Sequence, residues 1–210
     1  MSSLFAQSEL FDLIEKVEKG ERINRDAGVR MMNSKDILAL GYMANIVRER
    51  KNGNLTYYMV NGQYNYTNVH DAIMLYGNIK SAEERIDRIL HFRALQDQTN
   101  EFLSFTPLFD YPKDAKLEPM GTETTGLEDL KMLAISRILL DNYDHIKALW
   151  IMVGLKLTQV SLAFGVDYLE GKVVEQINDS GGSETSREMT KRAMIQMINK
   201  AGRDAVECKS

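Results

Sequence analysis

The sequence contains a single cysteine, Cys208, near its C-terminus. One cysteine cannot form an internal disulfide, and it cannot supply the several thiolates of a metal cluster. The sequence also lacks an apolar run long enough to cross a membrane as a helix. It has no large basic block and a net charge of −4, which argues against a dedicated nucleic-acid or anionic-membrane binder.

The N-terminal stretch MSSLFAQSELFDLIEKVEKG lacks the basic segment and the apolar core of a secretory signal. We therefore expect a cytoplasmic protein. The 210 residues are 44% hydrophobic and 27% charged, which is enough to bury a real core in one domain of ordinary size.

The first 53 residues have helical patterns. Gly20 is placed to end one helix, and Ser34 is placed to cap the next. Short strands and helices then alternate. The predicted strands are LTYYMV, AIMLYG, FLSFTPLF and IKALWIM, the last of which includes Trp150. The predicted helices run from about 82 to 99, 127 to 142, 155 to 164 and 187 to 201. Capping-box spacing is present at Thr125 and Glu128.

Strand–helix alternation predicts a parallel α/β sheet. Parallel neighbours need a crossover of a dozen or more residues, usually a helix. The first two strands are joined only by the polar stretch NGQYNYTNVHD, which has no helical stripe. These two strands are therefore either antiparallel or separated by a strand from elsewhere.

Residues 36–69 resemble the opening of the radical S-adenosylmethionine enzymes of menaquinone biosynthesis, and residues 72–178 resemble the closing half of the same enzymes. The carrying stretches include DILALGYMANIVRERKNGNLTYYMVNGQYNYTNV, AIMLYGNIKSAEERIDRILHFRALQDQT and GLEDLKMLAISRILLDNYDHIKALWIMVGLKLTQVSLAFGVDYLEGKVVEQI. The resemblance is closest to aminofutalosine synthase (aminodeoxyfutalosine synthase) and extends to its cyclase relative in the futalosine pathway.

This resemblance implies a partial, half TIM-type β/α barrel of roughly four strands with an N-terminal helical extension. The family binds a [4Fe–4S] cluster and S-adenosylmethionine through a C-x-x-x-C-x-x-C loop after the NYTN strand. Here the chain reads NYTNVHDAIMLYG, with His70 in place of the first cysteine and the other two absent. We predict no metal site, because His70, His91 and His145 fall in different elements without metal-ligand spacing.

GNIKSAEE resembles the family's adenine-supporting G-x-I-x-G-x-x-E element. The resemblance assigns cofactor binding to Gly77, Ile79 and Glu84, with Ser81 in place of the second glycine. The alternative is structural, because Ser81 and Glu84 have the spacing of a helix-capping box.

In the NYTN segment, Asn65, Thr67 and Asn68 can present polar groups at the end of a strand, so we predict that they bind substrate. The alternative is an Asx-type turn. FGVDYLEG resembles the family's FGADDLDG and adds Asp167, either at the mouth of the barrel or as a solvated turn residue. No catalytic residue can be assigned.

The predicted organisation is an N-terminal helical extension (1–54), a partial barrel (55–178) and a C-terminal linker with an amphipathic helix (179–210). One functional hypothesis is an aminofutalosine synthase-like protein that is inactive alone because the cluster cysteines are missing. It would need a complementing fragment. The other is a non-enzymatic remnant that oligomerises, as a homodimer through open sheet edges, or binds S-adenosylmethionine or another nucleoside.

Overall fold

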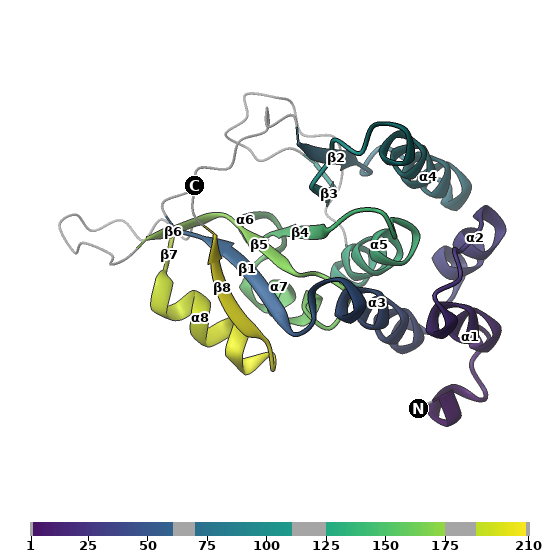
Figure 1. Ribbon diagram of the computed structural model, residues 1–210, viewed down its shortest axis with the longest axis horizontal. Coiled ribbons are helices and arrows are strands. Elements are labelled where there is room, and N and C mark those ends of the chain that lie inside the picture. The colour runs from purple at the N-terminus through teal and green to yellow at the C-terminus, as the bar shows by residue number, and fades with distance from the viewer. Residues whose placement is uncertain (1, 61–69, 111–124, 175–187, 209–210) are drawn as a thin grey trace.

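The computed structural model describes residues 2–60, 70–110, 125–174 and 188–208. A six-stranded sheet in the order β2-β3-β4-β5-β1-β8 forms the centre of the fold (Figure 1), and all neighbouring strands are parallel. Its strands are β1 (Leu55–Met59), β2 (Asp71–Leu75), β3 (Ser104–Leu108), β4 (His145–Leu149), β5 (Tyr168–Glu170) and β8 (Asp204–Cys208). Two short strands, β6 (Lys172–Val174) and β7 (Glu188–Thr190), form a separate parallel pair.

Helices surround this sheet. They are the 3₁₀ helix η1 (Ser2–Phe5) and the α-helices α1 (Phe11–Lys19), α2 (Arg25–Asn33), α3 (Ile37–Asn52), α4 (Ala82–Thr99), α5 (Gly126–Leu139), α6 (Trp150–Val153), α7 (Leu155–Ser161) and α8 (Lys191–Lys200). Helices α4, α5 and α7 pack directly against strands, whereas α2 packs on α4 and α3 packs on α5. In Figure 1 the helices α1 and α2 lie at the right edge of the molecule, and α8 lies beside β8 on the opposite side.

The predicted parallel α/β fold of the partial-barrel type is confirmed. The four predicted strands correspond to β1–β4, and the sheet is extended by β5 and β8. The unusual link between β1 and β2 is also explained. The two strands are not neighbours, because β5, β4 and β3 lie between them. Of the two alternatives, separation by other strands is confirmed and an antiparallel arrangement is wrong, because every pair of neighbours from β2 to β1 is parallel.

Three local predictions are wrong. Asp36 caps α3 by accepting from the Ala39 amide at 3.0 Å, whereas Ser34 closes α2. Thr125 precedes α5 without a side-chain cap hydrogen bond. Trp150 begins α6 instead of continuing β4. The prediction for Gly20 is confirmed, because it ends α1 in the left-handed conformation with φ of 78°.

Alternation along the strands gives the sheet two different faces. Phe105, Ile146 and Leu169 are fully buried in the hydrophobic core. The alternate residues point to the opposite face, which we call the inner face. There the strand register aligns side chains in layers, as in a β/α barrel. One layer contains Lys147 beside Tyr168 and another contains Leu149 beside Glu170.

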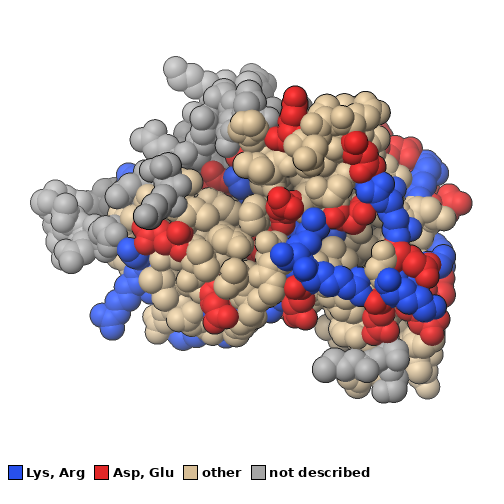
Figure 2. Space-filling view, viewed as in Figure 1, with Lys and Arg blue, Asp and Glu red and all other residues tan. Residues whose placement is uncertain are grey.

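The C-terminal part of the chain contributes to the central sheet, because β8 pairs with β1 over five residues. The predicted division at 54 and 178 remains a prediction. On the face shown in Figure 2, Lys and Arg side chains are interspersed with Asp and Glu over the helical part. None of the described helices combines the length and the apolar character needed to cross a bilayer.

Candidate binding site on the inner face of the sheet

Three charged side chains from three strands meet on the inner face. Lys147 Nζ on β4 lies 2.8 Å from Asp71 Oδ2 on β2 and 3.1 Å from Glu170 Oε2 on β5. The ammonium group also lies 4.8 Å from the centroid of the Tyr168 ring, and the Ser104 hydroxyl donates to Asp71 Oδ1. With two carboxylates and one ammonium group, this inner-face cluster (Asp71, Lys147 and Glu170) carries one net negative charge when it is ionised.

The inner-face cluster is poorly hydrated. The exposed fractions of the Lys147, Asp71 and Glu170 side chains are 9%, 10% and 17%. Burial raises the pKa of the Glu170 carboxyl, and Lys147 opposes this shift. Burial also raises the pKa of the Tyr168 hydroxyl and of the Cys208 thiol. Glu170 ends β5, and the carboxyl ends of the strands are the edge at which β/α barrels bind their ligands.

A buried hydroxyl lies next to this cluster. Thr106 on β3 is 1% exposed, and within the described part of the chain its Oγ1 has no hydrogen-bond partner. The indole nitrogen of Trp150, just after β4, is likewise buried without a partner there. Buried polar atoms are normally satisfied, so these two require an explanation.

Local sequence patterns do not predict this cluster. The available signal was Lys147, a charged residue inside the otherwise apolar stretch IKALWIM. Its partner Asp71 is 76 positions away in the sequence, and the pairing depends on β3 lying between β2 and β4.

The predicted cofactor residues Gly77, Ile79 and Glu84 lie at the turn between β2 and α4. The Gly77 amide donates to the Phe109 carbonyl at 2.9 Å, and a Cβ at this position would lie 2.3 Å from that oxygen. Glycine is therefore required by packing. Ile79 is 3% exposed and belongs to the hydrophobic core, and Glu84 is exposed. Adenine binding here stays a prediction.

The capping alternative for this turn is confirmed. The Ser81 hydroxyl accepts a 3.0 Å hydrogen bond from the Glu84 amide at the start of α4. Arg85 Nε also donates to the Ile79 carbonyl at 2.8 Å, which holds the turn in place. These contacts require no ligand.

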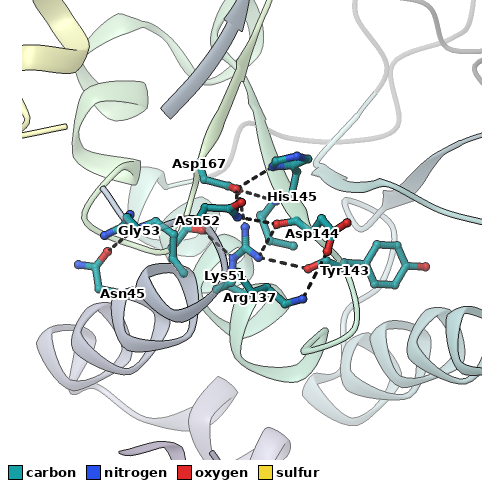
Figure 3. A network of polar contacts seen from close by, with 12 residues as sticks. Asn45, Lys51, Asn52, Gly53, Arg137, Tyr143, Asp144, His145 and Asp167 are labelled. Atoms are coloured by element: carbon teal, nitrogen blue, oxygen red, sulfur yellow. Dashed lines mark hydrogen bonds and ion pairs between the residues drawn. The ribbon is translucent and has the colours of Figure 1, made fainter. Parts of the chain in front are cut away.

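Asp167 lies at the opposite end of the sheet from the expected mouth, because it directly precedes β5. It is 0% exposed, so it is not a solvated turn residue either. Its carboxylate accepts from the buried Arg137 guanidinium and from the Ile146 amide, and it lies 2.8 Å from His145 Nδ1 (Figure 3). Both locations expected for Asp167 are wrong. Its contacts are those of a structural anchor.

The Asp167 network connects several elements. Asn52, at the end of α3, donates to the Asp167 carboxylate and to the Asp144 carbonyl (Figure 3). Arg137 Nε donates to the Gly165 carbonyl at 2.9 Å. Burial lowers the pKa of the Arg137 guanidinium, and the Asp167 carboxylate opposes this shift. The network ties α3 and α5 to the amino ends of β4 and β5.

The other predicted substrate residues, Asn65, Thr67 and Asn68, lie outside the described residues. His70 is exposed, with Nδ1 3.0 Å from the Glu101 carbonyl oxygen, and His91 lies against Phe92 on α4. His145 belongs to the Asp167 network. The three histidines are therefore in separate environments.

A pocket of about 420 Å³ lies on the helical side, away from the sheet. Its lining includes Arg25 and Arg30 of α2, which form bidentate pairs with Asp87 and Asp12. Because both guanidinium groups are already neutralised, this pocket has no clear chemical preference.

The donor set does not fit a [4Fe–4S] cluster. Such a cluster is normally held by several cysteine thiolates, and this chain has one cysteine. Cys208 lies at the end of β8, and the described residues contain no group of three His, Cys, Asp or Glu side chains placed to hold a metal ion. We therefore derive no chemical step through a cluster bound to this chain.

Together, these features define an α/β protein of the partial-barrel type with a charged, buried inner face. The family model for the CofH/MqnC C-terminal region matches residues 99–206, just over half of the chain. The chain belongs to this family.

Over 141 aligned residues, this chain is 43% identical to aminodeoxyfutalosine synthase of Thermus thermophilus. They are 35% identical, over 136 residues, to a 5-amino-6-(D-ribitylamino)uracil–L-tyrosine 4-hydroxyphenyl transferase of Methanoculleus marisnigri. These matches cover 65% and 63% of this chain. The chain spans only 38% and 37% of the length of these relatives.

Among solved structures, HydG, a maturase of the [FeFe]-hydrogenase, matches with a TM-score of 0.67 over 99% of this chain and 77% of its own. HydG from Carboxydothermus hydrogenoformans matches with a TM-score of 0.63 over 97% of this chain and 80% of its own. Both are 9% identical in sequence, so they show a common fold and nothing about activity.

Proposed function

We propose that this chain is an aminofutalosine synthase-like protein of menaquinone biosynthesis that contains substrate-binding strands but not the cysteine loop, which we call the substrate-side part. We also propose that it cannot perform the radical reaction alone. The observation that carries this proposal is the combination of 43% identity to aminodeoxyfutalosine synthase with a single cysteine. The proposal locates this protein in the cytoplasm.

The open edge of the sheet supports a complementing partner. Among the described strands, β2 pairs only with β3, so its other edge has no strand beside it. Unpaired edges favour association with another strand. We propose that a polypeptide with the cysteine loop, or a second copy of this chain, pairs at this edge. A second copy would still lack the thiolates.

A second candidate function is a nucleoside-binding remnant without catalysis, and the inner-face cluster favours it. Three buried charges add little to the stability of a fold, because replacing buried ion pairs with apolar residues is often neutral or stabilising. Their presence on the inner face therefore favours a role in binding. Both candidates therefore assign ligand binding to the same face.

Cluster reconstitution tests the proposed function. The purified chain is incubated anaerobically with iron and sulfide, its absorption spectrum is recorded, and cleavage of S-adenosylmethionine to 5′-deoxyadenosine is assayed. The Thermus thermophilus enzyme is the positive control. We expect no stoichiometric cluster and no cleavage by this chain alone. A stoichiometric [4Fe–4S] spectrum from the chain alone would contradict the proposal.

A mixing experiment tests the partner. The chain is combined with the cysteine-bearing N-terminal part of the Thermus thermophilus enzyme, and S-adenosylmethionine cleavage is compared with that of each component. Cleavage only in the mixture supports a complementing fragment. Light scattering of the chain alone gives the second readout, and a monomer at high concentration contradicts a homodimer through the β2 edge.

A further inference from the structure

We propose that Glu170 and Thr106 form a subsite on the inner face that binds the hydroxyl groups of a small sugar, such as the ribose of a nucleoside. This inference rests on the proposed function, because it names the chemical group that the substrate-side face recognises. It concerns binding only and needs neither a cluster nor a reaction.

Glu170 has unused capacity to accept hydrogen bonds. An ionised carboxylate offers about four acceptor positions. Its Oε2 forms an ion pair with Lys147 but has no hydrogen-bond partner in the described part of the chain. Lys147 is shared with Asp71 and also lies over the Tyr168 ring, so its ammonium group is already occupied. A donor for the remaining positions of Glu170 therefore has to come from a bound molecule or from water.

Lys147 does not require Glu170 for neutralisation. Asp71 approaches the ammonium group more closely, at 2.8 Å against 3.1 Å, and Asp71 is itself stabilised by the Ser104 hydroxyl. The pair of Lys147 and Asp71 is neutral without Glu170. A second buried carboxylate adds an uncompensated charge, which costs stability unless hydrogen-bond donors satisfy it.

Thr106 points into the same region. Ser104 faces Asp71 on the inner face, and Thr106, two residues further along β3, faces the same way. Ser104 is aligned with His145, so Thr106 lies beside Lys147, which is two residues beyond His145 on β4. The hydroxyl of Thr106 is therefore buried next to the cluster without a partner in the described part of the chain.

The charge of this region selects the kind of ligand. A net negative cluster repels phosphate and carboxylate groups, whereas hydroxyl groups donate to a carboxylate and accept from a threonine hydroxyl. A carboxylate that binds ribose hydroxyls is a recurrent arrangement in α/β proteins. A sugar with neighbouring hydroxyls can donate one hydrogen bond to Glu170 and exchange another with Thr106.

The test uses adenosine and 2′,3′-dideoxyadenosine, which share a base and differ in the sugar hydroxyls. Calorimetric titrations compare the full chain with Glu170→Gln and Thr106→Val. Glu207→Gln is the matched control, because Glu207 lies between Val206 and Cys208 on β8 and pairs with Lys191 away from the cluster. Circular dichroism establishes that each variant is folded.

We expect the wild type to bind adenosine roughly tenfold more tightly than the dideoxy compound, because a charge-assisted hydrogen bond is lost. Glu170→Gln should remove this difference, Thr106→Val should reduce it, and Glu207→Gln should leave it intact. Equal affinity for both nucleosides in the wild type, an unchanged difference in folded Glu170→Gln, or no binding of adenosine at all overturns the inference. These binding outcomes do not depend on cluster reconstitution. A failure of this inference can therefore be told apart from a failure of the proposed function.

The pH profile gives a second readout. The titratable groups that act on Glu170 are Lys147 from β4, Asp71 from β2 and Tyr168 from β5. Cys208 from β8 acts on Tyr168 and Lys147 in turn. Burial raises the pKa of Glu170, so its carboxylate takes up a proton at a higher pH than an exposed glutamate, and this proton replaces a hydrogen-bond acceptor. Adenosine affinity should rise with pH through this pKa in the wild type and stay constant in Glu170→Gln. The same pH dependence in both proteins contradicts the assignment.

Discussion

At the scale of single residues, Arg137 and Asp167 form an ion pair that is fully buried. Both side chains are 0% exposed, and they come from α5 and from the residue before β5. Replacing Asp167 with Asn leaves the guanidinium charge buried with only neutral partners. We expect a loss of about 3–5 kcal/mol in the free energy of unfolding, measured by urea denaturation.

Asp12→Asn is the matched control, because Asp12 pairs with Arg30 in a bidentate contact at the surface. Exposed pairs of this kind contribute less than about 1 kcal/mol. Should Asp167→Asn and Asp12→Asn destabilise the protein equally, the buried pair would not be the anchor described above. The double variant Arg137→Met, Asp167→Asn should recover part of the loss, since it removes both charges together and keeps an acceptor for the Ile146 amide.

At the scale of elements, the start of α4 allows capping to be measured directly. The Ser81 hydroxyl accepts from the Glu84 amide, whereas Thr125, at the equivalent position before α5, makes no such bond. Ser81→Ala should therefore cost about 1 kcal/mol of unfolding free energy, and Thr125→Ala should cost much less. Thermal unfolding of the two variants decides this. A larger effect for Thr125→Ala would show that the cap assignments are reversed.

The same elements show how far sequence patterns predict this fold. Helix α4 and strands β1–β4 follow from local periodicity and β-propensity, and they were predicted close to their observed bounds. Strand β5 has only three residues, and β8 is a partly exposed strand at the sheet edge, so neither has a strong pattern of its own. The spacing of Thr125 and Glu128 predicted a capping box, but Glu128 instead binds Arg85 across the helix interface.

The candidate site was less predictable than the fold. The sequence draws attention to Gly77 and Ser81, and the contacts observed at these positions are a close approach to Phe109 and a helix cap. The inner-face cluster depends on the order of the strands in the sheet, which local patterns do not contain. Asp167 was identified from a motif, yet its place before β5 could not be read from that motif.

At the scale of the whole molecule, strand β8 near the C-terminus covers the edge of strand β1. Strand β8 pairs with β1 along its full length, from Leu55 opposite Asp204 to Met59 opposite Cys208. Arg203 adds hydrogen bonds to the Leu162 carbonyl and to the Asn45 side chain. The β1 edge would otherwise present a row of unpaired backbone groups.

A chain that ends at Gly202 should therefore associate through the exposed β1 edge, because unpaired N–H and C=O groups at a strand edge template pairing with another chain. Light scattering should show larger species for this truncated chain than for the full chain, and urea denaturation should show lower stability, because the contacts of Arg203 are also lost. A chain that ends at Cys208 is the control, since it retains β8 and should behave like the full chain. Identical size and stability for all three would mean that β8 neither covers the β1 edge nor stabilises the sheet, and the partner-binding edge would then have to be sought at β1 as well as at β2.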